Sequence, residues 1–257
     1  RALINAAKNG KKVLVQIELQ ARFDETNNII YAEQMQSAGV ELIFGIPGLK
    51  VHSKICVIEK KINNKRKRFG FISTGNLNED TAKVYTDYTL FTSNQKILRD
   101  VNKVFNFLQV HYKLKKYKHL IVSPHYTHNA IVKLIDNEIK NKKLGLSSGI
   151  KLKLNAITNF SMINKLYEAS NAGVNIKMIV RGICCLIPDV SGMSENIKVI
   201  SVVDKFLEHS RVYSFNNGGN EKIFISSADF MTRNIENRVE VATPVSYTHL
   251  RAHETDR

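Results

Sequence analysis

The sequence is poor in the residues that build disulfide frameworks and membrane spans. It has four prolines, three cysteines and no tryptophan in 257 residues. The cysteines, Cys56, Cys184 and Cys185, are odd in number and two are adjacent, which speaks against a disulfide framework and favours a reducing cytoplasm. No run of about 18 apolar residues is present, so no membrane-spanning helix is predicted. Walker A, G-x-G-x-x-G and Cys-rich zinc patterns are also lacking, which excludes a P-loop type of nucleotide site.

Acidic residues are scarce relative to basic ones. The chain has 23 Asp and Glu against 38 Lys and Arg, giving a net charge of +15 and a pI near 9.7. Such a surface favours a polyanionic partner: nucleic acid, an anionic membrane or polyphosphate. Lys, Asn and Ile are abundant, as codon bias in an AT-rich genome would also produce, so the excess of positive charge has two open interpretations.

The two ends of the chain call for separate treatment. The N-terminal RALINAAKNGKK has no apolar signal core and has the pattern of a helix already under way, which predicts a fragment. Residues 245–257, VSYTHLRAHETDR, differ from the Lys/Asn/Ile-rich chain before them and resemble a translated sequencing adapter. We therefore expect a non-native tail after Pro244 and leave it out of the fold prediction.

An internal repeat organises the rest of the chain. HSK at 52–54 matches HSR at 209–211, and FIST at 71–74 matches FISS at 224–227. Helical and strand patterns precede and follow both copies in the same order. Helices are expected at 2–10, 29–39, 95–108 and 162–173, and strands at 13–19, 40–46, 52–59, 67–74, 85–92, 174–180, 197–203, 209–215, 221–227 and 239–243. This alternation predicts two tandem α/β domains with mixed sheets, 1–118 and 119–244, related by a pseudo-twofold and sharing one site at their interface.

The two H-x-K/R elements are the strongest candidates for chemistry. Alternation along a strand puts His52 and Lys54 on one face, and likewise His209 and Arg211. A neutral imidazole can attack phosphorus, and a nearby cation can bind the phosphate oxygens. One H-x-K is common by chance, and a lone His is usually structural. Two copies at matching places in a repeat favour a phosphoryl-transfer site.

Four further residues are candidates by position. Arg22 and Arg181 end corresponding strands, where ligands bind in open α/β sheets. Asn76 lies in a Gly-Asn turn and could bond a phosphate, and Tyr85 could stack on a base or bond a phosphate. A surface ion pair, an ordinary turn and a core tyrosine are the alternatives. The histidines at 119, 125 and 128 lack acidic or Cys partners for a metal and are expected in loops.

At these residues the sequence resembles the C-terminal half of the bacterial polyphosphate kinase family, built on paired phospholipase-D-like domains. The resemblance covers residues 1–244 and is carried by QIELQARFDETNNI, GIPGLKVHSKICVI, STGNLNEDTAKVYTDYTLFT, LSSGIKLKLN, IVRGICCLIPDVSGMSENI, FLEHSRVYSFNNGG and SSADFMTRNIENRVEVATP.

This resemblance implies an ATP:polyphosphate phosphotransferase that works through a phosphohistidine. His52 would be the nucleophile, and Arg22 would lie near a Mg²⁺ site. The ATP phosphates would be held, or the transfer assisted, by His209, Arg181 and Tyr85. The implied partners are ATP/ADP, polyphosphate and, in the full-length protein, a second copy. Nucleic acid is not expected, and peripheral membrane association is an option. The family's N-terminal domains are not found in this sequence.

Two other functions remain as alternatives. A phospholipase-D-type phosphodiesterase or nuclease would form the same phosphohistidine with water as acceptor. Its motif has Asp five residues after the Lys, where this chain has Glu59 in one copy and Asn216 in the other, and Arg211 replaces the second Lys. An inactive, basic polyanion-binding fragment is the non-enzymatic alternative.

Overall fold

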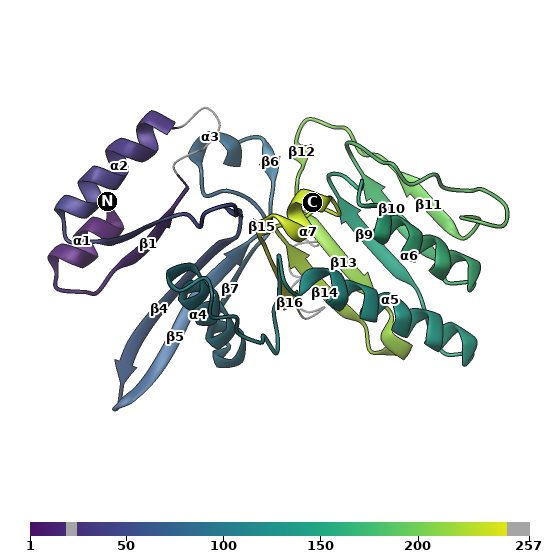
Figure 1. Cartoon of the computed structure of the whole chain (residues 1–257), viewed down its shortest axis with the longest axis horizontal. Helices are drawn as coiled ribbons and strands as arrows, with labels where there is room; N and C mark the ends of the chain where they lie inside the picture. The colour runs from purple at the N-terminus through teal and green to yellow at the C-terminus, as the bar shows by residue number, and fades with distance from the viewer. Residues whose placement is uncertain (19–24, 246–257) are drawn as a thin grey trace. The chain divides into compact units, whose positions relative to one another are not determined.

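The protein is described here from a computed structural model that covers residues 1–18 and 25–245 (Figure 1). The chain divides into two compact units, Arg1–Val51 with Asn102–Lys116, and His52–Val101 with Tyr117–Arg257. Within the described ranges no helix is both long and apolar enough to cross a bilayer.

The first unit is a small α/β element. Helices α1 (Ala2–Lys8) and α2 (Glu25–Ser37) accompany the parallel strands β1 (Leu14–Ile17) and β2 (Glu41–Phe44), followed by β3 (Lys50–Val51). The chain turns at Gly10 and Gly39, whose φ angles of 72° and 85° favour glycine just after a helix. The predicted helices and strands of this region are present.

A mixed seven-stranded sheet forms the core of the second unit. Its strand order is β11-β10-β9-β13-β14-β16-β8, with β9, β10 and β11 parallel and the other pairs antiparallel. The strands are β8 (Ile121–Val122), β9 (Ile150–Leu154), β10 (Ile176–Val180), β11 (Ile197–Ile200), β13 (Arg211–Phe215), β14 (Lys222–Ser226) and β16 (Val241–Val245). Helices α5 (Thr127–Lys143) and α6 (Phe160–Asn171) lie beside it (Figure 1). They bury Ile131, Ile135, Met162 and Leu166 completely, each worth about 1.5–3 kcal/mol of transfer free energy.

A three-stranded antiparallel sheet belongs to the same unit. It has the order β4-β5-β7, from β4 (Lys54–Ile62), β5 (Lys65–Ser73) and β7 (Thr89–Thr92). Helix α4 (Gln95–Gln109) begins against it, with Leu98 and Val101 fully buried. The remaining elements are short: α3 (Glu79–Ala82), β6 (Tyr85–Thr86), β12 (Leu207–Glu208), η1 (Asn217–Gly219), α7 (Thr232–Glu236) and β15 (Arg238–Val239).

Two local expectations were wrong. Strand β4 begins at Lys54 rather than His52, and β13 begins at Arg211 rather than His209, so both histidines precede their strands. Helix α5 was not predicted, and His128 lies in it rather than in a loop. Its three closing lysines and interspersed polar residues weaken the apolar periodicity that reveals a helix.

Candidate active site

The backbone amide of each candidate histidine donates to a residue from the opposite half of the sequence. The His52 amide donates to the carbonyl of Val239 at 3.0 Å. The His209 amide donates to Thr86 Oγ1 at 3.3 Å, beside the parallel pairing of β12 with β6. Because each histidine precedes its strand, its amide is free of the strand ladder for such a contact. These contacts bring the two repeats together within one compact unit.

Each imidazole is hydrogen-bonded to a carboxylate that the other half supplies. Nδ1 of His52 lies 2.9 Å from both carboxylate oxygens of Glu240, and Nδ1 of His209 lies 2.9 Å from both oxygens of Asp87. An ionised carboxylate can only accept, so each Nδ1–H donates. In the neutral ring this leaves the Nε2 lone pair available. The pairing therefore fixes the same tautomer in both imidazoles, with Nε2 as the acceptor nitrogen.

The two carboxylates occupy equivalent places in the repeat. Asp87 follows Phe71 by 16 positions, and Glu240 follows Phe224 by 16 positions. The Glu240 side chain is only 1% exposed, while that of Asp87 is 20% exposed. The repeated pattern thus extends beyond the histidines to their supporting acids, with each acid serving the histidine of the other copy.

A hydroxyl supports each carboxylate in turn. Thr74 Oγ1 donates to Asp87 at 2.6 Å, and Ser227 Oγ donates to Glu240. Thr74 and Ser227 are again equivalent, since they end the FIST and FISS segments. The site therefore contains two chains of the same kind, hydroxyl to carboxylate to imidazole, crossed between the repeats.

The surroundings keep His52 suited to nucleophilic attack. Burial lowers the pKa of His52, the hydrogen bond and charge of Glu240 oppose this, and the positive charges of Lys54 and Arg211 lower the pKa further. The lowered pKa favours the neutral ring at neutral pH, and a neutral ring with Nδ1 occupied is nucleophilic at Nε2.

Lys54 is a buried cation next to this nucleophile. Its ammonium donates to the backbone carbonyl of His52. Burial lowers the pKa of Lys54 to about 7, with Glu240 opposing and Arg211 reinforcing the shift. A phosphate arriving at Nε2 would meet this ammonium and favour its charged form.

Arg211 is bound by protein groups on several sides. Its Nη2 donates to Asp229 at 2.9 Å and its Nε to the same carboxylate at 3.3 Å. Its Nη1 lies 3.3 Å from the Thr74 carbonyl and 3.2 Å from Nε2 of His209. An arginine can only donate, so this contact uses the Nε2 lone pair of His209. The charge of Arg211 also acts on His52, which links the two imidazoles electrostatically.

Arg181 and Tyr85 join the same cluster. Arg181 Nε donates to the side-chain Oδ1 of Asn155. The Nδ2 of Asn155 donates to the His209 carbonyl at 3.0 Å, and its backbone N–H donates to Asp229 at 2.7 Å. Burial lowers the pKa of Arg181, and the nearby Arg211 adds to this. The Tyr85 ring lies 4.8 Å from the His209 ring at an angle of 50° and is 37% exposed, so it is not a core tyrosine.

Two sequence candidates are not joined to this cluster by any described contact. Asn76 is exposed in the turn after β5, and Arg22 lies outside the described residues. In residues 1–18 and 25–245 no group of three or more His, Cys, Asp or Glu side chains could hold a metal ion. The predicted roles of these two residues remain predictions.

Several contributing residues carry no motif of their own. These are Asp87, Asn155, Asp229, Arg238 and Glu240. The equal spacing of the two acids from the FIS segments was a usable signal, because aligning the repeats places them opposite each other. Asn155 had no such signal, since its contacts join strands that are distant in sequence.

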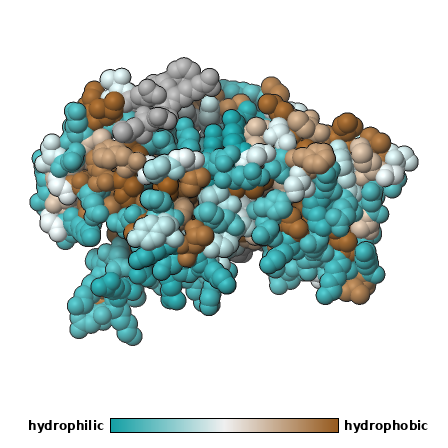
Figure 2. All heavy atoms as spheres, in the orientation of Figure 1, coloured by the Kyte–Doolittle hydropathy of each residue, from teal (hydrophilic) through white to brown (hydrophobic). Residues whose placement is uncertain are grey.

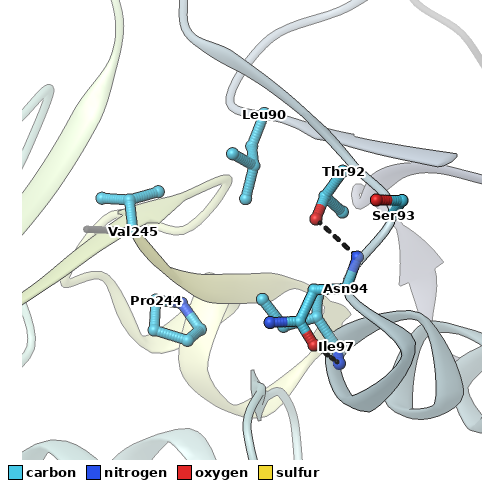
Figure 3. A pocket seen from close by; sticks show the side chains of 7 residues that line it. All are labelled: Leu90, Thr92, Ser93, Asn94, Ile97, Pro244 and Val245. Carbon is cyan, nitrogen blue, oxygen red and sulfur yellow. Dashed lines mark hydrogen bonds between the residues drawn. The ribbon is translucent and has the colours of Figure 1, made fainter. Parts of the chain in front are cut away.

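A separate hollow of about 570 Å³ is lined by residues of the second unit (Figure 3). Its lining includes Leu90, Ile97 and Pro244, and the Asn94 amide there donates to Thr92 Oγ1 at 3.0 Å. None of its lining residues belongs to the histidine cluster. The two histidine chains are therefore the candidate site, and the hollow is not part of it.

Comparison with known proteins gives a consistent result. Models of polyphosphate kinase C-terminal domain 1 and C-terminal domain 2 match residues 1–114 and 120–256. Polyphosphate kinases of Escherichia coli (strain K12) and Salmonella typhimurium (strain LT2) are each 49% identical to this chain over 244 residues. The match covers 95% of this chain and 36% of each relative, so the chain spans about a third of their length.

Solved structures agree with the sequence matches. The crystal structure of polyphosphate kinase from Porphyromonas gingivalis has a TM-score of 0.86 and 43% identity, covering 99% of this chain and 42% of that one. A mutant of yeast tyrosyl-DNA phosphodiesterase has a TM-score of 0.50 at 10% identity over 91% of this chain and 77% of that one, which shows a shared fold alone. The expected α/β class and the tandem pair of domains are confirmed.

Proposed function

Because the chain belongs to the polyphosphate kinase family, we propose that it carries the phosphoryl-transfer region of an ATP:polyphosphate phosphotransferase. The observation that supports this most is the arrangement at His52. Its Nδ1–H is 2.9 Å from a buried carboxylate, its pKa is lowered, and a buried ammonium adjoins it. This combination gives a neutral, oriented nucleophile next to a phosphate-binding charge.

The reaction proceeds in two in-line displacements. Nε2 of His52 attacks the γ-phosphorus of ATP, forming an N–P bond while the P–O bond to ADP breaks and ADP leaves with its electron pair. Glu240 holds Nδ1–H and stabilises the positive charge that develops on the ring. A terminal oxygen of polyphosphate then attacks the phosphohistidine, and the N–P electron pair returns to Nε2. The reverse sequence makes ATP.

The remaining residues spread charge and orient groups. Lys54 and Arg181 neutralise the transferring and leaving oxygens, since phosphoryl transfer depends on positioning and charge. His209 bonds or protonates the leaving oxygen once the phosphate displaces the Arg211 contact at its Nε2. Tyr85 packs on the His209 ring. Arg211 is committed to Asp229 and His209, so its contribution is to hold His209 and to add long-range positive charge.

A magnesium ion is expected to accompany ATP, but the described residues do not form a site of their own for it. The acids Asp87, Asp229 and Glu240 are each bonded to an imidazole or a guanidinium. An arginine such as Arg22 would act on phosphates near the metal rather than on the metal itself. Mg²⁺ commonly binds through substrate phosphates and water, so we place it with the nucleotide and assign it no step.

The wider setting of the enzyme is also proposed. ATP/ADP and polyphosphate are its substrates, the complete gene product is a homo-oligomer, and it works in the cytoplasm. The two domains end near residue 118 and residue 244. The net charge of +15 supports peripheral contact with an anionic membrane as a further option, with no nucleic acid required.

The test is labelling of the complete gene product with γ-³²P-ATP and mapping of the acid-labile phosphate. His52 should carry the label, His52→Gln should abolish it, and His128→Gln, which alters a histidine bonded to Ser161, should retain it. Labelled polyphosphate should then lengthen. Diester cleavage without chain growth would instead identify a phosphodiesterase, and label on another residue would remove His52 from its role.

A further inference from the structure

Strands β4 and β5 form a long hairpin whose outer part, residues 59–68, we call the basic arm. The strands pair without interruption from Lys54 opposite Ser73 to Ile62 opposite Lys65. Asn63 and Asn64 connect them with φ angles of 49° and 58°, as in a two-residue type I′ turn. Figure 1 shows the hairpin as a continuous ribbon. The arm is therefore a defined element rather than an irregular loop.

The basic arm concentrates positive charge. Its ten residues, EKKINNKRKR, hold six cations and one acid. Glu59 pairs with Arg66 at 3.3 Å and with Arg68 at 2.7 Å. The lysines at 60, 61, 65 and 67 are exposed and form no ion pair with any acid in the described parts of the chain. Figure 2 shows a hydrophilic surface over this hairpin.

The pairing register places like charges directly opposite each other. Lys60 faces Lys67 across the ladder, and Lys61 faces Arg66. Directly opposite like charges destabilise a hairpin, so this arrangement costs stability in the free protein. A bound polyanion would offset the repulsion between these cations. The hairpin sequence is therefore better suited to the anion-bound protein than to the free protein.

Three lysines share the face that helix α4 leaves open. The opposite face packs on the helix, because a side chain at Gly70 would meet Leu98. Residues 59, 61, 66 and 68 alternate onto the same face as Gly70, whereas Lys60, Lys65 and Lys67 lie on the other. These three ammonium groups therefore point away from the helix and are accessible to a ligand.

The arm is continuous with the candidate active site. Lys54, which bonds the His52 carbonyl, is the first residue of β4, and Thr74, which bonds Asp87, directly follows β5. Six residue steps lead from Lys54 to Lys60, a span of roughly 20 Å along an extended strand. A long anionic chain bound at the site can therefore reach the cations of the arm.

The composition of the arm favours a bare phosphate chain as the ligand. Residues 59–68 contain no aromatic side chain on which a base could stack, and Ile62 is their one apolar residue. Ile58, Phe69 and Phe91 are exposed farther along the same face, outside the arm, so vesicle binding is an outcome that the test must separate. We propose that the basic arm is a distal binding site for polyphosphate, which holds the chain away from the transfer site. The proposal rests on the function proposed above.

Binding of fluorescent long-chain polyphosphate to the 257-residue chain provides the test. Lys60→Gln, Lys65→Gln and Lys67→Gln, combined, should weaken binding at low salt by about tenfold or more. The slope of log affinity against log salt should fall by about 2, on the scale for single strands. Replacing the same three lysines by Arg should preserve binding, which separates loss of charge from loss of structure.

The matched control removes three exposed lysines from another sheet. Lys177, Lys198 and Lys222 lie on β10, β11 and β14, and the first two also face each other. Replacing these by Gln makes the same change in net charge and should leave affinity within about twofold. Equal weakening by both triple variants would mean that only bulk charge matters and would overturn the proposal.

Chain length and competitors complete the experiment. The loss in the arm variant should grow from tripolyphosphate to long chains, and equal loss at all lengths would contradict a distal site. Single-stranded RNA and phosphatidylserine vesicles are compared with polyphosphate at equal phosphate concentration. If either binds more strongly than polyphosphate, the arm is assigned to that partner instead. Labelling of His52 by γ-³²P-ATP in the unaltered gene product is measured in parallel, so failure of the proposed function is recognised separately.

Discussion

Nδ1 of His52 lies 2.9 Å from the carboxylate of Glu240, although 188 residues separate the two in sequence. The carboxylate also accepts from Asn234 Nδ2 at 2.6 Å and from Ser227. Since the Glu240 side chain is 1% exposed, its orientation is fixed by these three donors rather than by water. The second repeat thus determines which nitrogen of the first repeat's histidine is free to react.

Replacement of Glu240 by Gln should separate the orientation of the His52 ring from the binding of ATP. An amide can present its NH₂ group to Nδ1, which favours the tautomer with a proton on Nε2 and blocks the lone pair. We expect the single-turnover rate of His52 phosphorylation to fall on the order of 10²- to 10⁴-fold, with a smaller change in the affinity for ATP. Glu195→Gln, on an exposed residue, is the control. A variant within threefold of the parent rate would remove Glu240 from the mechanism.

The pKa of Lys54 predicts a dependence of ATP use on pH. Burial brings this pKa to about 7, so the ammonium is charged below pH 7 and loses its charge as the pH rises through 7. Glu240, Arg211, Asp87 and Arg238 are the charged groups that act on it. We expect kcat/KM for ATP to decrease above about pH 7.

The matched variant is Lys54→Arg, because guanidinium does not titrate in this range. Its pH profile should lack the decrease near pH 7, even if the longer side chain lowers the rate throughout. A profile for this variant with the same decrease as the parent would assign the titration to another group.

Much of the site could be predicted because it is repeated. The paired H-x-K/R elements identified His52 and His209 from spacing alone, and the FIS segments gave the register that also relates Asp87 to Glu240. Strand and helix positions followed from local periodicity, as for β10 and α6. These features depend on residues that are close in sequence or equivalent in the two copies.

The remaining features depend on contacts that no local pattern encodes. Asn155 is a buried polar residue at the end of an apolar strand, and only the folded sheet shows that it joins Arg181 to His209. Similarly, the sequence predicts Arg211 as a phosphate ligand, and only the fold shows that its guanidinium is also bonded to Asp229. A buried ion pair of this kind joins residues that no local pattern relates.

Asn155 should act as a positioning residue for Arg181. Its Oδ1 accepts from Arg181 Nε, so Asn155→Ala releases the guanidinium while leaving its charge in place. We expect KM for ATP to rise by about threefold to thirtyfold with a smaller change in kcat, as for a lost charged hydrogen bond. Asn155→Ala and Arg181→Ala should be non-additive, because they remove the same contact. Full additivity in steady-state kinetics would show that the two side chains act independently.

The ion pair between Arg211 and Asp229 should dominate the stability of the site. Their side chains are 5% and 7% exposed, and burial opposes ionisation of Asp229 while Arg211 holds the pKa of its carboxyl below the ordinary value. Asp229→Ala leaves a buried guanidinium without its partner, which should cost about 3–5 kcal/mol of unfolding free energy.

Urea unfolding provides the measurement, with the midpoint expected to fall at an unchanged m-value. Replacing both residues, by Arg211→Met and Asp229→Leu, removes both charges together. This double variant should regain much of the stability that Asp229→Ala loses, because the desolvation cost disappears with the pair. The double variant should nevertheless lose activity, since Nε2 of His209 no longer has the donor at 3.2 Å. If Asp229→Ala cost less than about 1 kcal/mol, the pair would not be a determinant of the fold.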